Sequence, residues 1–175
     1  MRLFETRQDR ARYVRGALFA LVFVAIVAFC PLRSFQVSGE SMEPRLMDGE
    51  KILVEELIPR FSELTRGDIL VFRHPRNPGR YLIKRVVGLA GETVEIRQGL
   101  LYVNGARLHE GYLPGSSLDR SDLAPLRLGR GELFVMGDHR NDSQDSRSWG
   151  PLDRGLVVGR ALVSYWPPRA AGYLR

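Results

Sequence analysis

The strongest constraint in this chain is an uncharged apolar run that spans residues 16–32 near the N-terminus. As an α-helix with a rise of about 1.5 Å per residue, this run is about 25 Å long, against about 30 Å for the hydrocarbon core of a bilayer. Arg15 and Arg33 flank the run, and their long side chains can extend to the two membrane interfaces. The pattern therefore predicts a single transmembrane anchor over residues 16–32.

The residues before this run predict its orientation. Residues 1–15 carry five arginines against two acidic residues, and basic flanks stay on the cytoplasmic side. We therefore expect a cytoplasmic N-terminus, a single pass through the cell membrane in contact with lipid, and residues from 33 onward on the outer face. A cleaved secretory signal would need small residues before the cut, which residues 29–32 do not supply. A soluble buried helix is an open alternative, but no amphipathic stripe is visible.

Composition limits the number of domains and the kinds of binding partner that the chain can have. With 175 residues, the chain can form one domain with short appendages. A net charge of +6 suits nucleic acid or an anionic membrane surface, but the arginines are dispersed among acidic residues. Nucleic-acid binding is therefore not expected. The only cysteine, Cys30, excludes an internal disulfide.

After residue 32 the pattern becomes that of β-structure. Short apolar runs alternate with turn signals, and Asn104-Gly105 between two apolar runs is a strong hairpin signal. Such a series predicts a mainly β fold, an antiparallel β-barrel or sandwich. The expected divisions are a juxtamembrane linker at 33–38, a β-rich domain at 39–167 and a tail at 168–175.

Ser41 stands out as a hydroxyl on a stiffened turn. Gly39 lies two residues before it and Pro44 three residues after it, and a strand-like run begins at Lys51. The surroundings predict a serine whose position is fixed by the fold.

Lys84 is the second candidate. It lies in an apolar run at 81–87 that reads as a strand, and alternation places it on the same face as Leu82 and Val86 and away from Arg85. Burial lowers the pKa of a lysine, and a neutral amine can act as a general base. The sequence holds only one other lysine, Lys51. Because arginine does not deprotonate in proteins, a lysine retained here favours a titratable role.

A third constellation is the loop at 137–147, which is dense in hydroxyls and paired charges. Such a loop at a strand end can orient a nearby base through hydrogen bonds. The alternative for this loop is a solvated turn or a cation site. Asp138, Asp142 and Asp145 do not have the spacing of an EF-hand, which argues against calcium, and no metal site is expected.

Together, these segments resemble the bacterial type I (leader) signal peptidases. The likeness covers Ser41-Met42 with Pro44, Arg66-Gly67-Asp68, the strand around Lys84, and the loop from Gly137 to Arg147. The order of the segments, their spacing and the anchor also fit, over roughly residues 16–166. The resemblance implies a serine endopeptidase without a cofactor, which cuts signal peptides from exported preproteins after small-x-small motifs.

The resemblance also implies roles for individual residues. Ser41 is expected as the nucleophile and Lys84 as its base, with Ser143 orienting the amine. Gly39 occupies a position where some members have a hydroxyl, so the oxyanion donor is expected to be the Ser41 backbone N–H. The remaining expected site residues are the bracing pairs Asp145 with Arg147 and Asp138 with Arg85, and the pocket residues Phe35, Val37, Met42, Leu46, Leu82 and Ile83.

Alternatives to this function remain open from sequence alone. A peptidase that matures pilins in conjugation would share the chemistry, and an anchored β-rich binding protein would need none. A Ser-His-Asp hydrolase would use His74, His109 or His139, but no nucleophile elbow accompanies them.

Overall fold

The computed structural model describes residues 12–21, 32–56, 63–113 and 120–174. The chain divides into two units, residues 1–31 and residues 32–175. Residues 12–21 form a helix. No helix in the described residues has the length and apolarity needed to cross a membrane. Residues 22–31 of the predicted anchor lie outside the described residues.

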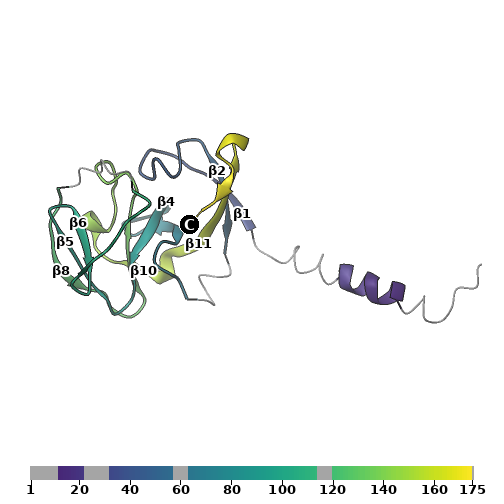
Figure 1. Ribbon diagram of the computed structural model, residues 1–175, viewed down its shortest axis with the longest axis horizontal. Helices are drawn as coiled ribbons and strands as arrows, with labels where there is room; N and C mark the ends of the chain where they lie inside the picture. Colours follow the sequence, from purple (N-terminus) through teal and green to yellow (C-terminus); the bar gives the residue numbers. More distant parts are fainter. Residues whose placement is uncertain (1–11, 22–31, 57–62, 114–119, 175) are drawn as a thin grey trace, which may run out of the picture. The chain divides into compact units, whose positions relative to one another are not determined.

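The second unit consists mainly of antiparallel strands (Figure 1). In chain order the strands are β1 (Leu32–Gln36), β2 (Lys51–Glu55), β3 (Ile69–His74), β4 (Asn77–Gly88), β5 (Thr93–Arg97), β6 (Leu100–Val103), β7 (Ala106–Arg107), β8 (Leu123–Arg127), β9 (Glu132–Met136), β10 (Leu152–Asp153), β11 (Val157–Trp166) and β12 (Gly172–Tyr173). The short helices are α3 (Ser146–Trp149), η1 (Arg154–Leu156) and η2 (Pro168–Ala170).

These strands form two sheets. The larger runs in the order β1-β2-β11-β3-β4-β9-β10, with β12 paired to β11, and the smaller runs β7-β6-β5-β8. The predicted mainly β, antiparallel fold is confirmed, but the large sheet is an open path and does not close into a barrel. Alternating strands specify pairing and a buried face, whereas closure also depends on strand tilt and register. β1 occupies much of the predicted linker at 33–38, and β12 lies within the predicted tail.

The core surrounds β4 on both faces. Val86 belongs to a cluster with Phe72 and Val135, and Val87 to a cluster with Phe134 that includes strands of the small sheet. At the end of β4, a Cβ on Gly88 would lie 2.5 Å from Val94. Glycine therefore allows the two sheets to approach each other closely, and residues 84–88 of β4 are all buried.

Candidate active site

Ser41 lies in the loop at 37–50 between β1 and β2, which backbone hydrogen bonds close at its base. Val37 N donates to Glu50 O at 2.8 Å, and Gly49 N donates to Val37 O at 3.0 Å. Gly39 adopts φ +92°, a conformation that favours glycine, and its N–H donates to the Asp48 carboxylate at 2.7 Å. The loop therefore holds the serine hydroxyl in a defined position.

Lys84 on β4 contacts this serine. Its Nζ lies 2.5 Å from Ser41 Oγ and donates to the Ile83 carbonyl at 2.9 Å. Lys84 is buried, and only 2% of its surface is exposed to solvent. Burial lowers the pKa of Lys84 from 10.5 to about 8, although Asp145 and Asp138 oppose that shift. A substantial neutral fraction near pH 8 gives this amine the capacity to accept a proton from Ser41.

The loop after β9 packs directly against the serine turn. His139 N donates to the Ser41 carbonyl at 3.1 Å, and a Cβ on Gly137 would clash with that carbonyl and with Ser143 Oγ. Glycine at 137 therefore lets the two loops touch. Ser143 Oγ is buried and has no hydrogen-bond partner in the described part of the chain. The bond from Ser143 to Lys84 that the resemblance implies is not present among the described residues, where the amine contacts Ser41 and the Ile83 carbonyl.

Asp145 holds the end of the same loop in shape. It is fully buried, and both carboxylate oxygens accept from the Arg147 guanidinium, at 2.9 and 2.8 Å. It also caps the short helix α3 through Arg147 N and accepts from Gly137 N at 3.1 Å. One carboxylate thus ties α3 to the start of the loop.

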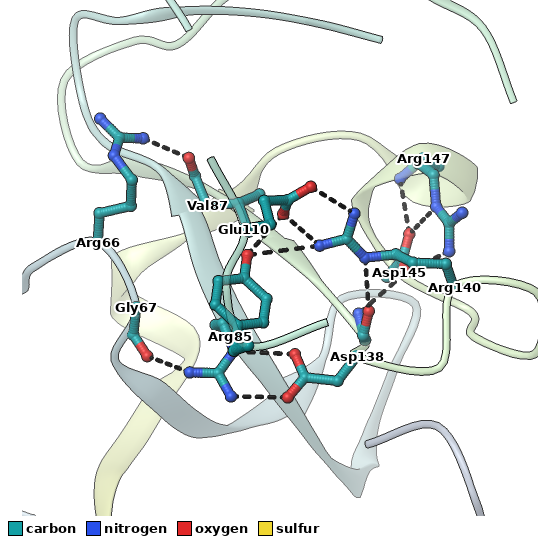
Figure 2. A network of polar contacts seen from close by, with 11 residues as sticks. Arg66, Gly67, Arg85, Val87, Glu110, Asp138, Arg140, Asp145 and Arg147 are labelled. Atoms are coloured by element: carbon teal, nitrogen blue, oxygen red, sulfur yellow. Dashed lines mark hydrogen bonds and ion pairs between the residues drawn. The ribbon is translucent and has the colours of Figure 1, made fainter. Parts of the chain in front are cut away.

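Arg85, the neighbour of Lys84, faces the other side of β4. Its guanidinium donates to both oxygens of Asp138, at 2.8 and 2.6 Å, and to the Gly67 carbonyl at 2.9 Å (Figure 2). Both partners of the ion pair are almost completely buried. The pair connects the Lys84 strand to the loop that packs on Ser41.

A further buried group was not anticipated from sequence. Arg140 contacts both oxygens of Glu110, and its Nε donates to the Gly137 carbonyl at 3.0 Å (Figure 2). Tyr112 donates to Glu110 at 2.5 Å, and its ring lies 4.2 Å from the guanidinium carbon of Arg85. Glu110 and Tyr112 lie in a segment that reads as an irregular connection, so no local pattern indicates their partners.

A groove of about 600 Å³ opens beside Ser41 and Lys84. Four of the predicted pocket residues line it, namely Phe35, Val37, Leu82 and Ile83. Met42 and Leu46 do not line it, because both are fully buried in the core cluster under the serine loop. Residues not anticipated from sequence also line the groove, among them Gln36, Arg80, Tyr81, Asp142 and Gln144.

Comparison with known proteins places this chain. The family described as "Signal peptidase, peptidase S26" matches residues 10–166. The "Signal peptidase I" of Leptolyngbya laminosa is 37% identical, over 90% of this chain and 77% of the relative. The "Probable signal peptidase I-1" of Synechocystis sp. is 34% identical, over 90% and 83%. A crystal structure of a signal peptidase I from Enterococcus faecalis V583 is similar with a TM-score of 0.50 and 34% identity, over 57% of this chain and 97% of that chain.

These matches first define the class: the chain is a serine peptidase, a hydrolase of peptide bonds. Within that class it belongs to the signal peptidase family, peptidase S26, which confirms the resemblance inferred from the motifs.

Proposed function

We propose that this protein is a membrane-anchored serine endopeptidase that removes N-terminal signal peptides from exported preproteins with a Ser-Lys dyad. The observation that carries the proposal is the 2.5 Å contact between Ser41 Oγ and the buried Lys84 Nζ. The relatives named signal peptidase I support the substrate class.

The proposed chemistry begins with the neutral Lys84 amine, which takes the proton of Ser41 while Oγ attacks the scissile carbonyl. The Ser41 backbone N–H is the proposed donor to the oxyanion, since Gly39 offers no hydroxyl. As the tetrahedral intermediate collapses, the Lys84 ammonium returns its proton to the leaving amine of the mature protein. The same amine then activates a water that hydrolyses the acyl-enzyme.

The proposed supporting residues act through loop geometry. The two pairs Arg85 with Asp138 and Arg147 with Asp145 hold the loop at 137–147 against the serine turn. Ser143 is the proposed orienting hydroxyl for the Lys84 amine, and its unpaired, buried Oγ supports this because it retains its hydrogen-bonding capacity.

Substrate selection is proposed to occur in the groove. An extended peptide can lie there beside β4 and gain affinity from its backbone and selectivity from its alternate side chains. Phe35, Val37, Leu82 and Ile83 present the apolar surface, which suits the small residues of a small-x-small site. The proposed anchor at 16–32 places the domain on the outer face of the cell membrane, where exported chains emerge.

The test uses full-length protein in detergent and a preprotein with a small-x-small site. We expect Ser41→Ala and Lys84→Ala to abolish cleavage, and Lys84→Arg to be inactive as well because its guanidinium stays charged. Lys51→Ala is the matched control, since Lys51 is exposed and its loss should leave cleavage intact. Circular dichroism checks that each variant is folded. Cleavage that persists in folded Ser41→Ala or Lys84→Ala protein would refute the dyad.

A further inference from the structure

Three potential metal ligands converge beside the serine turn. Glu40, His139 and Asp142 each offer one ligand atom, and these atoms lie within 4.8 Å of one another. Glu40 directly precedes Ser41, whereas the other two come from the loop after β9. The cluster therefore joins two segments that are about 100 residues apart in sequence.

Backbone hydrogen bonds hold the three positions in place. His139 N donates to the Ser41 carbonyl at 3.1 Å, and Asp142 N donates to the His139 carbonyl at 3.1 Å. On the other side, Glu43 N donates to the Glu40 carbonyl at 2.9 Å. Each ligand-bearing residue is thus part of a closed turn, and the two turns are bonded to each other. We therefore expect an ion to bind here through rotation of the three side chains on a fixed backbone.

The histidine supplies an independent observation. His139 Nδ1 is buried from solvent and has no hydrogen-bond partner in the described residues. A buried polar atom without a partner is costly, and nitrogen of a neutral imidazole is the commonest donor to transition metals. No cationic side chain is recorded in contact with the Glu40 or Asp142 carboxylates among the described residues, and both residues are exposed. The two carboxylates are therefore available to rotate toward an ion.

We propose that Glu40, His139 and Asp142 form a binding site for a divalent transition-metal ion of the zinc class. One imidazole and two carboxylates match the nitrogen and oxygen ligands of Zn²⁺, and three protein ligands leave a position for water. With bond lengths of about 2.0–2.2 Å to a central ion, ligand atoms that lie within 4.8 Å of one another can reach one ion through side-chain rotation. The soft, thiolate-preferring ions are excluded by the donor set.

The position of the site beside the groove implies that a bound ion affects cleavage. Glu40 and Asp142 both line the groove that contains Ser41 and Lys84. A bound ion cross-links the serine turn to the opposing loop and occupies part of the groove wall, so it slows cleavage. This consequence rests on the proposed function, whereas the binding of the ion does not.

The test measures Zn²⁺ binding by isothermal titration calorimetry and Co²⁺ binding by absorption spectroscopy on untagged, full-length protein in detergent. We expect one ion per chain, and His139→Asn and Glu40→Gln should each weaken binding by more than about 10-fold, since even outer-shell changes cost 10–100-fold. His109→Asn is the control and should bind as the wild type does. Binding that is absent, or that is equal in the wild type and in both ligand variants, would overturn the site.

A second measurement separates the site from its consequence. Zn²⁺ should slow preprotein cleavage by the wild type, a chelator should reverse the effect, and His139→Asn should be insensitive. If Zn²⁺ binds through these residues but leaves the cleavage rate unchanged, the metal site stands and its inhibitory role is refuted. If Ser41→Ala binds Zn²⁺ normally while the wild type cleaves no preprotein, the proposed function fails and the site stands.

Discussion

Lys84 and Arg85 are consecutive basic residues on β4, and their side chains lie in different electrostatic surroundings. Both are almost fully buried, at 2% and 1% exposure. Arg85 contacts a carboxylate, a carbonyl and an aromatic ring. Within the described residues, the hydrogen bonds of Lys84 Nζ go to a hydroxyl and a carbonyl. The ion pair with Asp138 therefore compensates the charge of Arg85. Asp145 and Asp138 compensate the charge of Lys84 only in part, and burial lowers the pKa of Lys84 to about 8.

This difference matches the chemistry of the two residue types. Arginine keeps its charge and binds carboxylates through two parallel hydrogen bonds, so it suits a permanent buried brace. Lysine can lose its proton when it is desolvated. One face of β4 thus carries Arg85, which stabilises the site. The other face carries Lys84, whose burial costs free energy but makes the amine easier to deprotonate.

The largest effect is expected from breaking the compensated pair. Asp138→Asn leaves the buried Arg85 guanidinium without its counter-charge, and removing one partner of a buried pair costs about 3–5 kcal/mol of unfolding free energy. Urea denaturation of the full-length protein measures this loss. Glu56→Gln is the control, because its pair with Arg33 is on the surface and such pairs contribute at most about 1 kcal/mol. Equal effects of the two substitutions would show that Arg85 does not depend on Asp138.

The same strand shows what sequence can and cannot predict. Alternation correctly separates the faces of Lys84 and Arg85, because the period of a strand is local. It does not indicate that both faces are covered, since the cover comes from distant strands such as β9 and from the small sheet. The sequence therefore does not predict the burial of Arg85, whereas the family resemblance implies its pairing with Asp138.

Other differences between the sequence-based expectations and the structure also arise from packing between segments that are distant in sequence. The family resemblance implies that Met42 and Leu46 line the substrate pocket, but both are buried in the core beneath the serine loop. No local pattern indicates Glu110 and Tyr112, because the arginines that they contact, Arg140 and Arg85, are distant in sequence. Motifs predict which side chains take part, whereas three-dimensional packing decides which of them face the groove.

Substitution of Lys84 is expected to change the unfolding free energy by a smaller amount and in the opposite direction, as an increase. The pKa of Lys84 is about 8 in the folded protein and 10.5 ordinarily, so between these values the unfolded chain binds more protons and folding stability rises with pH. Below pH 8 the full cost of burying the ammonium is present. Lys84→Met removes that cost and should raise the unfolding free energy at pH 7 by about 1–3 kcal/mol, while abolishing cleavage.

The pH dependence distinguishes this explanation from better packing of methionine. The advantage of Lys84→Met over the wild type should decrease between pH 8 and 10.5, as measured by urea denaturation at several pH values. Lys51→Met, at an exposed position, should show no such trend. If the increase in unfolding free energy of Lys84→Met over the wild type does not change with pH, burial of the Lys84 ammonium is not what destabilises the wild type.

The smallest effect tests how the surroundings tune Lys84. The positive charge of Arg80, which lines the groove, contributes to the lowered pKa of Lys84. Arg80→Gln should therefore raise that pKa and move the acidic limb of the kcat/KM profile to higher pH, because kcat/KM reports groups of the free enzyme. Solvent screening limits the shift to roughly a few tenths of a pH unit. Arg76→Gln, on the same hairpin and also exposed, is the matched control and should not move the limb. A shift to lower pH in Arg80→Gln would contradict the assignment of that limb to the Lys84 amine, because loss of a nearby positive charge can only favour its protonated form.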